Sequence, residues 1–214
     1  MSNFEYIISG LPWLTLDYRY ESGKGYGTVV DEIRGNLSEK DGALVDDLLR
    51  GFDEASLTED FYAGALRHKL PFLREYFRFD LNLRNAKVRF LNKALGRDAE
   101  LDVMTGLGSE DDTDLDIDGY RFTGGEFEEE AAVQAALDQD DLLSRERALD
   151  EIVWAKVDSL ATFHYFDITA VLAYLAKLHI VDRWLSLDAE TGRELFRKLV
   201  SEVRGTFKGV EYNG

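Results

Sequence analysis

One acidic stretch of the chain comes near a metal-binding pattern, because it places carboxylates at alternate positions before a glycine: Asp114, Asp116, Asp118 and Gly119. This order matches the opening of a calcium-binding loop. Such a loop also needs a bidentate glutamate at its twelfth position, which here is Gly125. The spacing therefore favours a solvated acidic loop, with adventitious calcium binding as the alternative, and we expect no dedicated metal site.

Other residues capable of chemistry are not spaced as an active site requires. The glycines around Lys24 lack the spacing of a phosphate-binding loop, and no clear helix start follows them, so they predict a flexible turn. His68, His164 and His179 lack the partners of a zinc site, and we expect His164 to be a core or groove residue. No nucleophile elbow or dinucleotide fingerprint is present. We therefore expect no catalytic residues and no cofactor.

The composition favours helices and a reducing compartment. The 214 residues are 45% hydrophobic, which is enough to bury a core, and they include no cysteine and only two prolines. The start lacks the pattern of a signal peptide, and no stretch holds the about 20 apolar residues of a membrane span. We expect a cytoplasmic protein of all-α or mainly α fold.

The net charge of −17 is concentrated in one window of the chain. Residues 97–141 hold sixteen acidic and two basic residues, which is −14 of that total, and residues 109–118 are the most acidic part. Such a surface would repel a phosphate backbone, so we expect no nucleic-acid partner. The window predicts an acidic loop and helix between two helical lobes, residues 1–96 and 142–214, which could also pack as one domain.

The first lobe contains three expected helices. Residues 4–16 are apolar and form either a short buried strand or an irregular segment. A capping box predicts a helix over residues 38–50, and a second helix covers residues 58–69. A third helix begins at its expected cap, Asp80, and stops at Gly96.

Four further helices are expected after the first lobe. The acidic window ends in a helix over residues 126–143, and a long amphipathic helix covers residues 145–166. Asp167 caps the next helix, in which apolar residues recur at intervals of three and four. A last helix spans residues 188–204.

A short pattern occurs in both lobes. Phe79, Asp80 and Leu81 precede one apolar stripe, and the same kinds of residue recur 87 positions later at residues 166–168. This spacing is consistent with an internal repeat that relates the two lobes.

Two sets of side chains could serve a partner or the fold itself. Core packing or partner binding at helix corners would explain the aromatic set, which is Phe72, Tyr76, Phe77, Phe79, Trp154, Phe163, Tyr165 and Phe166. A basic set precedes the acidic window: Arg74, Arg78, Arg84, Lys87, Arg89 and Lys93. These side chains could form a solvated face, or they could contact an acidic partner or the acidic segment of this chain.

Three segments carry a family resemblance. Residues 79–91 (FDLNLRNAKVRFL) resemble a helical segment of the V-type ATP synthase C-subunit family. Residues 166–177 (FDITAVLAYLAK), followed by Asp182 and Arg183, look like a late helix of that family. The opening YIISGLP is similar to a short, divergent bacterial branch, of the kind catalogued as a family of unknown function.

The resemblance implies a mechanical role. Members of that family are helical, non-catalytic spacers that couple the central stalk of a V-type rotary ATPase to its membrane rotor ring during ion transport. The chain would then be peripheral to the inner membrane through the complex. The resemblance also implies a partner face that includes Asp80, Asn82, Asn85, Arg89, Tyr174 and Lys177. Asp80 has the alternative role of a helix cap.

Two other functions stay open. An unrelated helical adaptor or scaffold protein would share the composition and would also lack an active site. A metal-dependent enzyme is a third hypothesis, and it would need a concave pocket with convergent polar groups. Copurification with stalk and ring proteins would favour the rotary-ATPase role, whereas metal-dependent turnover of a metabolite would favour the enzyme.

Overall fold

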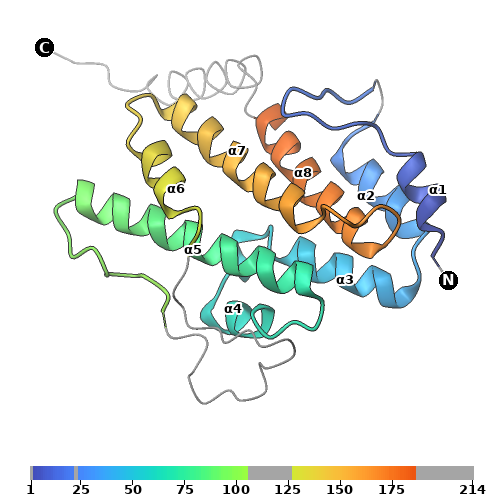
Figure 1. The fold of residues 1–214 in the computed structure, drawn as a ribbon, viewed down its shortest axis with the longest axis horizontal. Helices are drawn as coiled ribbons and strands as arrows, with labels where there is room; N and C mark the ends of the chain where they lie inside the picture. The colour runs from blue at the N-terminus through green and yellow to red at the C-terminus, as the bar shows by residue number, and fades with distance from the viewer. Residues whose placement is uncertain (1, 22–23, 106–126, 187–214) are drawn as a thin grey trace, which may run out of the picture.

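A computed structural model describes residues 2–21, 24–105 and 127–186, and this part of the chain is helical without any strand (Figure 1). The expected mainly α fold is confirmed. In chain order the elements are α1 (Phe4–Ser9), α2 (Tyr26–Gly35), α3 (Glu39–Arg50), the 3₁₀ helix η1 (Glu54–Ser56), α4 (Glu59–Ala65), α5 (Pro71–Ala94), α6 (Glu130–Leu137), α7 (Leu142–Leu160) and α8 (Ile168–Ser186). None of the described helices is long and apolar enough to cross a membrane.

Side-chain caps fix several helix starts. Ser38 Oγ accepts a hydrogen bond from the Asp41 amide at 3.2 Å, which confirms the expected cap of α3. Asp167 Oδ1 accepts one from the Ala170 amide at 3.1 Å, which confirms the cap of α8. Each cap satisfies an amide that has no partner inside its helix.

Helix α5 starts earlier than the sequence pattern predicts. Its first residue is Pro71, whose fixed φ suits a helix start, and Asp80 lies in the middle of the helix. Asp80 is therefore not a cap: its carboxylate accepts hydrogen bonds from the Tyr62 hydroxyl at 2.5 Å and from Arg84 Nε at 2.9 Å. The end is as expected, since Gly96 follows the helix with a φ of 65°.

The N-terminal elements also correct two expectations. The apolar segment expected as a strand or irregular stretch begins with α1, whose start is capped by Asn3 through the Tyr6 amide at 3.1 Å. The glycine run expected as a flexible turn leads directly into α2, because Gly25 is the residue that precedes this helix.

Helices α6 and α7 are shorter than expected. Helix α6 begins at Glu130 rather than at residue 126, and α7 ends at Leu160 rather than at residue 166. The most acidic residues, 109–118, and the helix expected over residues 188–204 lie outside the described residues.

The packing centres on three long helices (Figure 1). Helix α8 packs against α1, α2, α3 and α7, whereas α5 packs against α4, α6 and α7. The larger hydrophobic core draws on residues from Ile7 to Leu178, so both predicted lobes share it. Asp80 and Asp167 differ in position, one within a helix and one before a helix, so their sequence echo has no structural counterpart.

Candidate functional site

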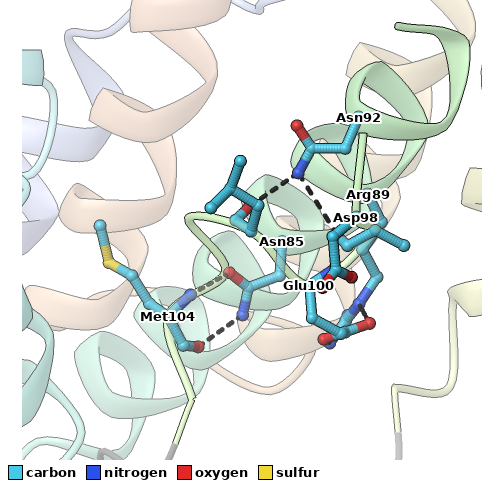
Figure 2. Close-up of polar contacts among 8 residues, drawn as sticks. Asn85, Arg89, Asn92, Asp98, Glu100 and Met104 are labelled. Atoms are coloured by element: carbon cyan, nitrogen blue, oxygen red, sulfur yellow. Dashed lines mark hydrogen bonds and ion pairs between the residues drawn. The ribbon is translucent and has the colours of Figure 1, made fainter. Parts of the chain in front are cut away.

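The predicted partner face on α5 is occupied by the chain itself (Figure 2). Asn85 is buried, and its side-chain amide donates to the Met104 carbonyl at 2.8 Å. Its side-chain oxygen accepts from the Met104 amide at 3.1 Å. Both backbone groups of Met104 are thus satisfied by one side chain, which suits a buried position where unpaired polar groups are costly.

Two more side chains hold the same segment. Arg89 makes a bidentate pair with Glu100, with both nitrogen–oxygen distances at 2.9 Å (Figure 2). Asn92 is buried and donates to the carbonyls of Leu101 at 2.6 Å and Ala99 at 3.4 Å. The hydrogen bond from Arg89 holds the pKa of Glu100 below its usual value.

Asn85, Arg89 and Asn92 are here called the α5 clamp. They follow one another at intervals of four and three, so they lie on one face of the helix. Gly96 turns the chain back toward this face. Of the roles open to the basic set, Arg89 therefore takes the contact with the acidic segment of its own chain, to which Glu100 belongs.

Most other cations of the basic set on α5 are also close to carboxylates of this chain. Arg74 and Arg78 both pair with Glu75, and Arg84 pairs with Asp80. These contacts lie within the helix or along its surface. The set is thus largely neutralised locally, and it offers less free positive charge to an acidic partner than its composition suggests.

A groove of about 580 Å³ lies between α5 and α6, which is a size in the range of small-molecule sites. Its walls include Asn82 and Phe90 from α5, Phe127, and Glu130 and Gln134 from α6. Its arginine, Arg89, is already paired with Glu100. The described residues that line it include no serine, threonine, cysteine or histidine, and its other ionisable side chains are Lys93, Glu130 and Asp138.

The other two predicted partner residues lie on α8, away from the α5 clamp. Lys177 pairs with Asp158 of α7, and its Nζ lies 5.0 Å from the centroid of the Trp154 ring. The Tyr174 hydroxyl is buried and has no hydrogen-bond partner among the described residues, and burial raises the pKa of this group. The six predicted residues thus do not form one face.

The turn between α7 and α8 carries a different set of exposed side chains. Phe163, Tyr165 and Phe166 are 85%, 67% and 57% exposed, and they are here called the aromatic turn. By contrast, the aromatic residues of the predicted set that belong to α5 are buried in the cores: Phe72, Tyr76, Phe77 and Phe79. Core packing therefore explains the α5 aromatics, and it does not explain the aromatic turn.

Local hydrogen bonds define the backbone of this turn. His164 Nδ1 lies 2.5 Å from Asp167 Oδ2, and the same carboxylate caps α8. The His164 amide donates to the Ala161 carbonyl at 2.9 Å. His164 is therefore a partly exposed turn residue, and its expected place in a core or groove is wrong.

The aromatic turn lies at the same end of the molecule as α1 (Figure 1). Phe166 shares a shallow depression of about 420 Å³ with residues at the start of the chain, from Ser2 to Glu5. Two further exposed aromatics, Tyr6 and Trp13, belong to α1 and the segment that follows it. Sequence reasoning did not single out these two, because an apolar segment gives no sign of which of its rings face solvent.

A buried charge pair connects α7 and α8. Asp150 is buried, pairs with Arg183, and accepts a hydrogen bond from Trp184 Nε1 at 2.5 Å. Arg183 also contacts Glu146 at 3.4 Å. Each member has a partner, as a buried charge requires.

No three metal-binding side chains lie close enough together to hold an ion in the described part of the chain.

The family follows from the sequence of residues 53–206, which match the sequence model described as "Protein of unknown function (DUF2764)". The match covers most of the chain, from before α4 to beyond the end of α8. The chain belongs to this family. No curated protein and no solved structure matches the chain.

This finding corrects the expected family. Membership of a family of unknown function is shown, but the assignment to the V-type ATP synthase C-subunit family is wrong, because the matching model is a different one. The resemblance depended on helical patterns with a few polar positions. In residues 79–91 those positions serve the chain's own packing, since Asp80 pairs with Arg84 and Asn85 holds Met104.

Proposed function

We propose that this protein is a non-catalytic helical adaptor that binds a protein partner through the aromatic turn. The supporting observation is the exposure of Phe163, Tyr165 and Phe166 on a turn whose backbone is defined by hydrogen bonds. Folded proteins rarely leave several large apolar rings together in water unless the patch has a binding role. Aromatic side chains are also enriched among residues that dominate binding energy at protein interfaces.

The geometry suits recognition more than chemistry. Exposed rings on an ordered turn lose little conformational freedom on binding, so more of the energy of burial contributes to affinity. The adjacent depression beside Phe4 and Glu5 would accept a side chain of the partner next to Phe166. The proposal therefore places one continuous contact over the α7–α8 turn and the start of α1.

The test is copurification from the cells that normally make the protein. We expect the tagged chain to retain a stoichiometric protein partner that crosslinks near the aromatic turn. Replacing Phe163, Tyr165 and Phe166 by serine should reduce the retained partner at least about tenfold, since each lost anchor removes on the order of 1–2 kcal/mol. Helix content should not change, because these side chains are exposed.

A matched control uses leucines that are exposed elsewhere. Leu91 and Leu95 are 57% and 64% exposed at the far end of α5, and replacing both by serine removes apolar surface without touching the turn. We expect this control to keep the partner. If the triple variant also keeps it, the aromatic turn is not the binding site.

The rotary ATPase role is one specific form of this proposal, and it stays a prediction. Its partners would be central-stalk and membrane-ring proteins, which mass spectrometry of the copurified material would identify. The family resemblance that suggested the role is overturned, so support for it would have to come from such copurification. If the copurified partner is unrelated to a rotary ATPase, only the general adaptor role would remain.

A further inference from the structure

The start of α7 exposes two consecutive leucines. Leu142 and Leu143 are 67% and 64% exposed, although they open a helix whose later turns are packed against α6 and α8. Asp141 caps this helix through the Ser144 amide at 2.7 Å, so the two leucines are held on a regular first turn. Their exposure costs burial energy that a covering segment would recover.

The described part of the chain ends beside these leucines. Helices α7 and α8 are antiparallel, because Arg183 near the end of α8 contacts Glu146 near the start of α7. Ser186, the last residue of α8, therefore lies at the same end of the helix pair as Leu142. The described part of α8 therefore ends on the same side of the helix pair as the exposed leucines.

The sequence after α8 has the pattern of a helix that must be covered on one face. Between residues 188 and 204 the apolar positions recur at helical spacing: Leu195, Phe196, Leu199, Val200 and Val203. Arginines recur at intervals of four and seven along one flank of that face: Arg193, Arg197 and Arg204. The family match extends to residue 206, so this stretch belongs to the unit that the family shares.

The surface next to Leu142 has the opposite charge. Asp138, Asp140 and Asp141 form the connection between α6 and α7, and none of them makes an ion pair within the described part of the chain. An apolar face with an arginine flank would thus meet exposed leucines next to carboxylates that lack a cation. Charge complementarity of this kind fixes the orientation of a contact.

We propose that residues 188–204 dock as an amphipathic helix across the start of α7, with Leu199 and its apolar neighbours on Leu142 and Leu143 and the arginine flank facing the aspartates of the α6–α7 connection. The segment completes the fold at this end. The contact is independent of the aromatic turn, which lies at the opposite end of α7.

Disulfide trapping tests the contact directly, because the chain has no cysteine of its own. A full-length variant with Leu143→Cys and Leu199→Cys should form an intramolecular disulfide under mild oxidation, seen as faster migration on a non-reducing gel and as loss of free thiol. The control pairs Phe163→Cys, which is 85% exposed and lies beyond the opposite end of α7, with Leu199→Cys. We expect it to crosslink at least about tenfold more slowly, since cysteines with distant Cα atoms cannot be bridged.

Two outcomes would overturn the proposal. Equal crosslinking rates in the two variants would show that residue 199 has no preferred position. A crosslinked dimer in place of a crosslinked monomer would show that a second copy of the chain covers the leucines.

Thermal unfolding gives an independent readout that does not require a disulfide. Leu143→Ser and Leu199→Ser should each lower the Tm by roughly 2–4 °C, and the double variant should lose little more than the larger single effect, because both changes break one contact. The pair Phe163→Ser and Leu199→Ser should be additive, because Phe163 lies beyond the opposite end of α7. Additivity in both pairs would contradict the docked helix.

Discussion

At the scale of single residues, the side-chain amide of buried Asn85 takes the place of a backbone hydrogen-bonding partner. Asn85 gives and receives a hydrogen bond with the main chain of Met104, so the segment after α5 is fixed without secondary structure. Arg89 and Asn92 hold the same segment at Glu100 and Leu101. The α5 clamp therefore fixes the position of residues 99–104 against α5.

Asn85→Ala should destabilise the protein by about 1–3 kcal/mol, because it leaves the amide and the carbonyl of the half-buried Met104 without partners beside a buried position. Urea unfolding measures the loss. The matched control is Asn82→Ala on the same helix, whose side chain is half-buried and makes no hydrogen bond within the described residues. Its effect should stay within about 0.5 kcal/mol, and equal losses in both variants would mean that the clamp has no special role.

Asn85 and Arg89 were singled out through the family resemblance, as part of a partner face, and not as residues that hold a segment of their own chain. A polar stripe on a helix looks the same whether it faces a partner or a returning segment of its own chain. The signal that could have separated them is Gly96, since a glycine stop directly after the stripe allows the chain to reverse. Asn92, one helical turn beyond Arg89, is the clamp residue that sequence reasoning missed.

At the scale of elements, the helices themselves could be predicted better than their ends. Apolar residues at helical spacing identified α3, α5, α7 and α8, because that periodicity reflects burial of one face. The start of α5 was placed at Asp80, since an aspartate before an apolar stripe resembles a cap, although Pro71 also signals a first turn. Only tertiary packing distinguishes these interpretations: Tyr62 of α4 donates a hydrogen bond to Asp80 from outside α5.

The end of α3 gives a prediction about packing between elements. Gly51 follows α3, and a Cβ at this position would lie 2.1 Å from Cε1 of Phe77, a buried ring of α5. Gly51→Ala should therefore destabilise the protein by about 1–3 kcal/mol, as overpacking does. Thermal or urea unfolding measures it.

Gly42 is the control for this substitution. It lies within α3 and has nothing within 4 Å of a Cβ built on it, so Gly42→Ala adds a methyl group without a clash. This change should stabilise the protein by about 0.5–1 kcal/mol, because alanine favours a helix over glycine. Opposite signs are expected for the two variants, and a neutral Gly51→Ala would show that Phe77 moves aside freely.

At the scale of the whole molecule, α8 unites the N-terminal helices with α7. The His179 ring of α8 stacks on Phe52 with centroids 4.1 Å apart, and Tyr26 of α2 approaches its edge at 6.1 Å. Nearby, Tyr20 donates to Asp182 at 3.2 Å. Aromatic and polar contacts thus meet where several helices pack, so a change of charge there affects the global fold.

Protonation of His179 should weaken the whole structure. Burial lowers the pKa of His179, and the nearby Arg183 lowers it further, so the unfolded chain binds this proton more readily than the folded one. The stabilisation is therefore fully present above the unfolded value of about 6.5 and is lost as the pH falls below it. The loss is about 1.4 kcal/mol for each unit by which the two pKa values differ.

Substitution of His179 distinguishes its contribution to the pH dependence of stability from the contributions of the other groups that bind protons on unfolding. His179→Gln cannot titrate, so its free energy of unfolding, measured in urea at pH 7.5 and 5.5, should change less between these pH values than that of the unmodified protein. If the free energy of unfolding of His179→Gln instead changes with pH as much as that of the unmodified protein, another group causes the pH dependence. Protonation of the stacked imidazole then does not destabilise the fold.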